Sequence, residues 1–134
     1  MSISRTLATK NLGLDAEFDQ LDNGYKRIYS GTRPATADTA LAGNTLLAEL
    51  RYAATAFGAA SGGTKSANTI TSDTDAAADG TATFFRNFKS DGTTVVNDGS
   101  VGVSGSGADA IINSTNIVQH TTVSCASEVY TAGA

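Results

Sequence analysis

The side chains that could do chemistry in this chain of 134 residues are few. His120 is the only histidine and Cys125 the only cysteine. A Ser-His-Asp triad would have to use His120, but no serine lies in a nucleophile-elbow context. One His and one Cys cannot assemble a zinc site by themselves. We therefore expect that the protein is not an enzyme and has no catalytic residue, metal site or cofactor.

Two other segments resemble binding loops only in part. Asp73, Asp75 and Asp79 could offer oxygen ligands to calcium, but their segment lacks the sixth-position glycine and the terminal glutamate of an EF-hand. Residues 62–65, Gly-Gly-Thr-Lys, resemble a phosphate-binding loop without its full spacing. We expect solvated acids in the first segment and a hairpin turn in the second.

The composition indicates a single domain with a modest core. Roughly half of the residues are Ala, Thr, Gly or Ser, and there is no Trp. The core must therefore be built from Leu, Ile, Val, four Tyr and five Phe. A chain of this length can bury one hydrophobic core but is short for two.

The charge pattern argues against a nucleic-acid partner. The net charge is −4, and the nine Lys and Arg are scattered along the chain, whereas phosphate binding needs a clustered basic surface. No stretch approaches the roughly 18 apolar residues of a membrane helix, so we expect no membrane partner. The N-terminus also lacks the apolar core of a signal peptide. A lone Cys125 is compatible with a reducing cytoplasm and is interpreted as a small buried residue in a strand.

An amphipathic helix is predicted over residues 5–23. Ser4 or Thr6 can cap its start, and Gly24 can end it. Its apolar residues recur at spacings of seven, four and three, which places them on one face: Leu7, Leu14, Phe18 and Leu21. We expect this face to pack on the protein's own sheet. The acidic residues of the second half are expected to face solvent: Asp15, Glu17, Asp19 and Asp22.

Short strands with turn signals fill the rest of the chain. The predicted strands are residues 25–29, 45–52, 53–60, 66–72, 81–89, 93–97, 110–118 and 121–130. Asp91 and Gly92 mark the clearest hairpin, and Asp98 with Gly99 a second turn. This spacing favours an antiparallel β-sandwich or jelly roll, preceded by the helix. Residues 1–24 would form the N-terminal arm and helix and residues 25–134 the sandwich, within one domain.

Alternation predicts which side of two strands faces the core. In the strand 45–52, Leu46, Ala48, Leu50 and Tyr52 share one face, expected to point inward. In the last strand, Val123, Cys125 and Val129 share one side. The other side of that strand carries Thr122, Ser124, Ala126, Glu128 and Tyr130.

Three stretches resemble a family of small tailed-bacteriophage proteins. They are IYSGTRPATADTALAGNTLLAEL at 28–50, ATFFRNFKSDGTTVVNDGSVG at 82–102 and INSTNIVQHTTVSCASEVYT at 112–131. Proteins of this kind are similar to capsid cement, or decoration, proteins, which are small β-rich modules on the outside of the head. The resemblance lies in the general character of these stretches and includes no catalytic motif.

This resemblance implies a structural virion protein made in the bacterial host cytoplasm and carried on the capsid exterior. It would bind the major capsid protein at capsomer junctions, as a homodimer or homotrimer, and stabilise the shell. The long segment 31–44 is the candidate capsid-contacting loop, with an ordinary connection as the alternative. Its candidate contact residues are Arg33, Pro34, Thr36 and Asp38.

Two other functions stay open. A tail, fibre or head-to-tail component would share the strand-rich composition but should form rings, tubes or elongated trimers. A carbohydrate-binding module would need tyrosines exposed on one platform, and the candidates are Tyr25, Tyr29, Tyr52 and Tyr130.

Overall fold

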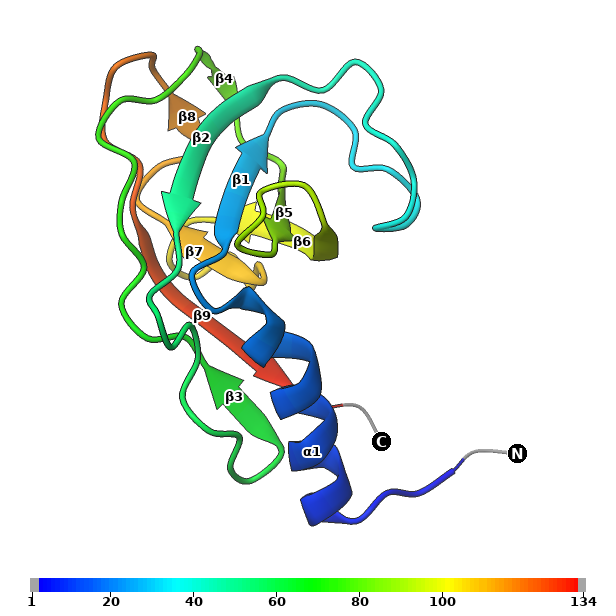
Figure 1. Cartoon of the computed structure of the whole chain (residues 1–134). Helices are drawn as coiled ribbons and strands as arrows, with labels where there is room; N and C mark the ends of the chain where they lie inside the picture. Colours follow the sequence, from blue (N-terminus) through cyan, green and yellow to red (C-terminus); the bar gives the residue numbers. More distant parts are fainter. Residues whose placement is uncertain (1–2, 133–134) are drawn as a thin grey trace.

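A computed structural model describes residues 3–132 as one N-terminal helix followed by short strands (Figure 1). The helical elements are α1 (Leu7–Phe18) and the 3-10 turn η1 (Asp19–Leu21). The strands are β1 (Tyr25–Tyr29), β2 (Leu46–Arg51), β3 (Thr64–Ser66), β4 (Gly80–Thr81), β5 (Phe84–Phe88), β6 (Val95–Gly102), β7 (Ala110–Ile112), β8 (Asn116–Ile117) and β9 (Cys125–Thr131).

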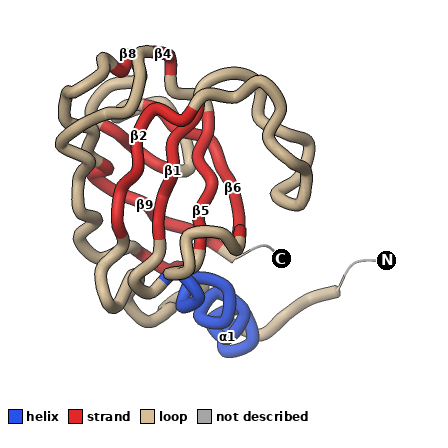
Figure 2. The backbone as a smooth tube through the Cα atoms, turned by 45° about the horizontal axis from the view of Figure 1, so that its top comes forward, coloured by secondary structure: helices blue, strands red, loops and turns tan. Residues whose placement is uncertain are grey.

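Seven strands form one curled sheet in the order β2-β1-β5-β6-β7-β9-β3, and β4 pairs with β8 in a small second sheet. The curl brings β9 across from β1 and β2, so the two halves of the sheet enclose a core (Figure 1, Figure 2). The predicted mainly β, sandwich-like fold with one N-terminal helix is thus confirmed. Its pairings are antiparallel except for β6 with β7, which run parallel.

Helix α1 begins where its cap predicts. The Thr6 side chain accepts a hydrogen bond from the Thr9 amide at 3.2 Å, which satisfies one of the free amides of the first turn. Leu14, Phe18 and Leu21 are buried, as predicted. The prediction for Leu7 is wrong, because its side chain is 54 % exposed. The first turn of α1 lies beyond the sheet (Figure 1), so no strand covers it.

Glu17 and Asp19 are exposed, as expected, and Asp15 and Asp22 are half-buried, but three of these acids also attach the helix to the chain beside it. Asp15 and Asp19 accept from the Lys65 ammonium of β3 at 2.5 and 3.0 Å. Burial of Lys65 disfavours its charge, but the hydrogen bonds to the two aspartates outweigh this and raise its pKa. Asp22 accepts from the Ala56 amide at 2.8 Å. These acids therefore hold the helix against the chain that it covers.

Several predicted strands are confirmed and others are wrong. β1, the β5-β6 hairpin with its turn at 91–92, and the long 31–44 connection are all present. Apart from Ser66, which ends β3, the segments 53–60 and 66–72 form only isolated bridges. Phe57 of the first segment packs against Phe18 of the helix, with ring centroids 4.9 Å apart. The predicted strand 110–118 is divided between β7 and β8.

The second predicted turn, at Asp98 and Gly99, is also wrong, since both residues lie inside β6. Two arginines bind the Asp98 carboxylate, which keeps this stretch in the sheet. Gly99 lies opposite Phe85 of β5, and a Cβ there would come within 2.6 Å of the Phe85 ring. The glycine thus serves close packing and not a turn.

A β-bulge changes the predicted faces of β2. Ile28 pairs with Ala48 and Tyr29 with Leu46, so Leu47 is an extra residue on its strand. Leu47 is completely buried, although alternation placed it on the outer face, and Leu46 is only half-buried. Ala48, Leu50 and Tyr52 are buried as predicted.

A second bulge acts in the same way in β9. Ile111 pairs with Ser127 and Ile112 with Cys125, which leaves Ala126 as the extra residue. Beyond the bulge the alternation is inverted. Val129, predicted to share the buried side of Cys125, is 51 % exposed, and the charged Glu128 is buried.

Replacing Phe18 by alanine should lower the free energy of unfolding by about 3–5 kcal/mol, because a buried ring is lost and a cavity remains. The ring stacks on Tyr130 with centroids 4.3 Å apart. Leu7→Ala, on the exposed first turn, is the matched control and should cost less than about 0.5 kcal/mol. Urea unfolding of both variants measures the difference, and equal losses would contradict the packing described for α1.

Candidate functional site

A cluster of polar side chains occupies the core between the two halves of the sheet. Lys26 of β1 and Asn87 of β5 are fully buried, and Glu128 of β9 is 2 % exposed. The hydroxyls of Tyr52 and Tyr130 complete this buried polar cluster. Charged side chains are rarely buried unless they are paired, so the cluster needs a specific physical account.

The sheet places the amine and the amide side by side. Lys26 and Asn87 are register partners in the antiparallel β1-β5 pair, so both side chains project from directly opposite positions on one face. Glu128 comes from the facing half of the curled sheet, 102 residues further along the chain than Lys26. The bulge at Ala126 is what turns Glu128 inward.

The contacts within the cluster are close. The Lys26 Nζ lies 2.9 Å from Glu128 Oε1 and 3.1 Å from Asn87 Oδ1. The Tyr52 hydroxyl lies 2.9 Å from Asn87 Oδ1 and 2.9 Å from Glu128 Oε2. The Tyr130 hydroxyl donates to Glu128 Oε1. One amine, one amide and one carboxylate thus share a single hydrogen-bond network.

Aromatic rings surround the amine. The Lys26 Nζ lies 3.2 Å from the centroid of the Phe85 ring and 5.7 Å from that of Tyr52. Burial lowers the pKa of Lys26, although the Glu128 carboxylate opposes this shift. Burial also raises the pKa of Tyr52, so its hydroxyl keeps its proton. Burial thus shifts the Lys26 equilibrium toward the neutral amine, which is the nucleophilic form of lysine.

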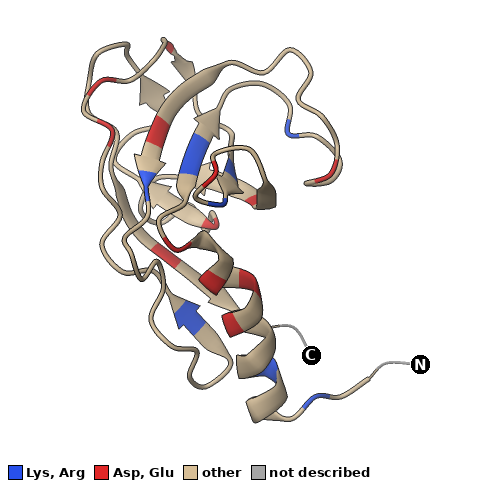
Figure 3. Cartoon of the chain, in the orientation of Figure 1, with Lys and Arg blue, Asp and Glu red and all other residues tan. Residues whose placement is uncertain are grey.

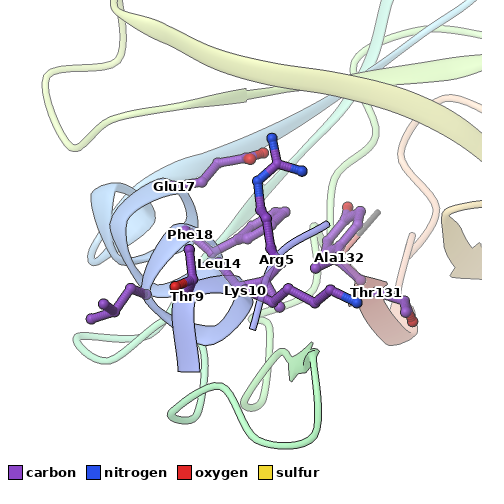
Figure 4. Close-up of a pocket in the computed structure, with 11 residues that line it drawn as sticks. Arg5, Thr9, Lys10, Leu14, Glu17, Phe18, Thr131 and Ala132 are labelled. Carbon is purple, nitrogen blue, oxygen red and sulfur yellow. The ribbon is translucent and has the colours of Figure 1, made fainter. Parts of the chain in front are cut away.

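A polar path leads from the amide to the surface. The Asn87 Nδ2 donates to Asn97 Oδ1 at 2.8 Å, and the Asn97 Nδ2 donates to Glu17 Oε2 at 2.7 Å. Glu17 is exposed and lines a groove of about 680 Å³ between α1 and the end of β9 (Figure 4). Phe18 and Tyr130 line the same groove.

Lys26, Asn87 and Glu128 were not among the candidate residues predicted from the sequence, whereas Tyr52 and Tyr130 were candidates only for a sugar-binding platform. Two of these residues carry a sign of burial in the sequence. Lys26 is two residues from Ile28, and Asn87 is two residues from Phe85, so each polar residue lies on the same face of its strand as an apolar one. Glu128 gave no usable signal, because the bulge at Ala126 inverts its predicted face.

The 31–44 loop projects from the sheet beside β6 (Figure 1, Figure 2), and residues 33–39 are bound to side chains of β5 and β6. The Arg33 Nη2 lies 2.9 Å from Asp98 Oδ1. Arg86 donates to the carbonyls of Thr36 and Thr39 at 3.1 and 2.5 Å. Among the buried side-chain nitrogen and oxygen atoms of the described residues, the Arg86 Nε and the Asp98 Oδ2 have no hydrogen-bond partner. These two atoms form an ion pair with each other at 3.6 Å.

The structure places the four predicted loop residues together at this projection. Arg33, Thr36 and Asp38 are exposed, and Pro34 is half-buried. Basic residues are spread over several elements, while acidic residues gather along α1 (Figure 3).

The acidic residues considered for calcium act as hydrogen-bond acceptors in loops. Asp73 Oδ2 accepts from the Glu49 amide at 2.8 Å, and Asp79 from the Gln119 amide at 2.7 Å. Asp75 contacts the exposed His120, which lies in the turn between β8 and β9 with φ 68°. Within residues 3–132, no three His, Cys, Asp or Glu side chains form a group that could hold a metal ion.

The tyrosine platform needed for sugar binding is not formed. Tyr29 and Tyr52 are 5 % and 2 % exposed, and Tyr25 and Tyr130 are half-buried. Tyr29 stacks on Phe84 with ring centroids 5.3 Å apart, and Tyr52 belongs to the buried polar cluster. Tyr29 and Tyr52 therefore belong to the core, and the four tyrosines do not form a common exposed surface.

Comparison of the chain with protein-family models, with curated proteins and with solved structures found no match. In the part of the chain that the structure describes, no helix is both long and apolar enough to cross a membrane. The function of this protein is therefore inferred from its own residues and their geometry.

Cys125 should be almost inert to thiol reagents in the folded protein. The side chain is buried, as predicted, and burial raises the pKa of its thiol to about 11. At about pH 8 the reactive thiolate is therefore scarce in the folded state and more abundant in the unfolded chain. Labelling with Ellman's reagent should be slow in buffer and rapid in urea. Rapid labelling of the folded protein would contradict the described burial of this strand.

Proposed function

We propose that this protein is a structural virion protein, a capsid cement or decoration protein that binds the outside of a tailed-phage head. Its partner would be the major capsid protein at capsomer junctions. The proposal rests on the sequence resemblance, and the structural observation that supports it is the exposed and anchored 31–44 loop. Synthesis in the bacterial host cytoplasm and a place on the capsid exterior belong to the same proposal.

The anchoring of the loop is the feature that suits binding. Arg33 and Arg86 both reach the Asp98 carboxylate, whose side chain is 5 % exposed. Hydrogen bonds from Arg86 to loop carbonyls hold the polypeptide itself. A loop that is already ordered loses less conformational entropy on binding than a flexible one, which favours affinity.

Many copies on one shell would add to the effect. Each copy needs only a modest contact area, because oligomeric attachment at several capsomers makes the later contacts intramolecular. We propose a homodimer or homotrimer for this reason. A tail, fibre or head-to-tail role would use the same kind of surface for rings, tubes or elongated trimers.

The test is co-sedimentation of the purified protein with phage heads that lack it, across a concentration series. Saturation at a fixed ratio to the shell protein is the expected result and gives the copy number. Failure to bind heads, together with assembly into rings or tubes, would overturn the cement role and favour a tail component. Electron microscopy of the protein alone separates these outcomes.

Charge reversal in the loop should weaken this binding. We expect Asp38→Arg to raise the Kd for heads at least tenfold, which corresponds to about 1.4 kcal/mol. Asp75→Arg is the matched control, since Asp75 is also exposed but its segment, before β4, lies on the opposite side of the molecule from the loop (Figure 1). An equal effect of both changes would point to overall charge and not to the loop.

A further inference from the structure

We infer that Lys26 and Asn87 become joined by an isopeptide bond, an amide between their side chains, formed by the protein itself with Glu128 as the proton-transfer group. The inference rests on the buried polar cluster and is independent of the surface through which the protein binds. It needs no cofactor, because amine, amide and carboxyl group are all supplied by the chain.

The geometry brings the reacting atoms together. The Lys26 Nζ is 3.1 Å from the Asn87 Oδ1, which is one bond from the carbonyl carbon that would be attacked. Both residues extend from paired positions of neighbouring strands, so folding alone holds them in place. Such positioning makes a slow reaction between two weak partners effectively intramolecular.

The carboxylate can make the amine nucleophilic. Glu128 Oε1 accepts a hydrogen bond from the Lys26 Nζ at 2.9 Å, and both side chains are completely buried. Transfer of one proton along this bond converts a buried ion pair into a neutral amine and a neutral carboxylic acid. Removing two charges from a core that cannot solvate them favours this transfer.

The surroundings also activate the amide. The Tyr52 hydroxyl lies 2.9 Å from Asn87 Oδ1, where it can donate to the oxygen that gains negative charge during attack. Phe85 covers the amine with its ring, and this helps to exclude water that would compete for the amide carbon.

The reaction balances without any further reagent. The Lys26 nitrogen forms a bond to the Asn87 Cγ, and the carbonyl electron pair moves to the oxygen. The intermediate collapses, the bond from Cγ to Nδ2 breaks, and this nitrogen leaves as ammonia with a proton from the attacking nitrogen, relayed through Glu128. A Lys26 ammonium, a Glu128 carboxylate and a primary amide thus become a secondary amide, a carboxylic acid and ammonia.

The leaving nitrogen has a route out of the core. It is bound to Asn97 at 2.8 Å, and Asn97 contacts Glu17 at 2.7 Å, at the groove beside α1 (Figure 4). Escape of ammonia along this route makes the reaction irreversible in practice. The product leaves a neutral amide and a neutral acid in place of a buried ion pair.

Lys65 provides an internal comparison. It is also buried, but its amine binds the partly exposed carboxylates of Asp15 and Asp19. Those two hydrogen bonds keep its charge, and within residues 3–132 its ammonium binds carboxylates and no amide side chain. Lys65 should therefore remain a free amine.

The first test is the mass of the purified full-length protein under denaturing conditions. It should be lower than the encoded mass by one ammonia. Trypsin should not cleave after Lys26, and it should yield one branched peptide in which residues 11–27 are joined to residues 87–89. Tandem mass spectrometry then locates the bond. Recovery of residues 87–89 as a free peptide in full yield would overturn the inference.

The peptide map also separates the bond from another loss of ammonia. Asn23 precedes Gly24, and succinimide formation there would lower the mass of the whole protein equally. That product would leave 87–89 free, so finding it alone counts against the inference.

Substitutions assign the roles. Lys26→Arg keeps a positive charge beside Glu128 but removes the amine, so it should retain the full encoded mass. Glu128→Gln keeps the shape of the carboxyl group but cannot accept the proton, so the branched peptide should be absent or form far more slowly. Both readings are taken only on variants whose circular dichroism matches that of the unchanged protein, so that a missing bond reflects the missing group and not a lost fold. Cross-linking of Glu128→Gln at the normal rate would remove Glu128 from the mechanism.

Discussion

The amino group of Lys26 is enclosed in the core, and much of the sheet is arranged around it. Removing a cation from water costs several kcal/mol unless partners replace the lost hydration. Glu128 and Asn87 supply those partners at 2.9 and 3.1 Å, and the Phe85 ring lies over the amine. Even the absence of a side chain at Gly99 contributes, because it leaves room for that ring.

Two buried lysines in one small domain illustrate how the partners decide the chemistry. Lys65 joins β3 to helix α1 through Asp15 and Asp19, which are partly open to water, and it stays charged. Lys26 binds one fully buried carboxylate and one neutral amide, and burial lowers its pKa. Lys65 therefore forms a structural ion pair, whereas Lys26 lies among the groups that a reaction between an amine and an amide would need.

The β5-β6 hairpin connects the interior with the proposed binding surface. Arg86 pairs with Asp98 across the hairpin, and the next pair is Asn87 with Asn97. Neighbouring residues of a strand point to opposite faces. Arg86 and Asp98 therefore lie on the face that holds the 31–44 loop, and Asn87 and Asn97 lie on the face that contains the buried polar cluster. A covalent bond at Asn87 would therefore also strengthen the base of the loop, as suits a protein proposed to reinforce a shell.

The sequence by itself determined the helix, its cap at Thr6, the first strand, the hairpin at 91–92 and the mainly β class, because these follow from local periodicity and turn chemistry. The tertiary structure alone decided the rest. Bulges at Leu47 and Ala126 changed which residues of β2 and β9 face the core, and alternation cannot reveal an extra residue. The curl of the sheet then brought Glu128 to Lys26 across 102 residues, a juxtaposition set by long-range strand pairing and not by any local pattern.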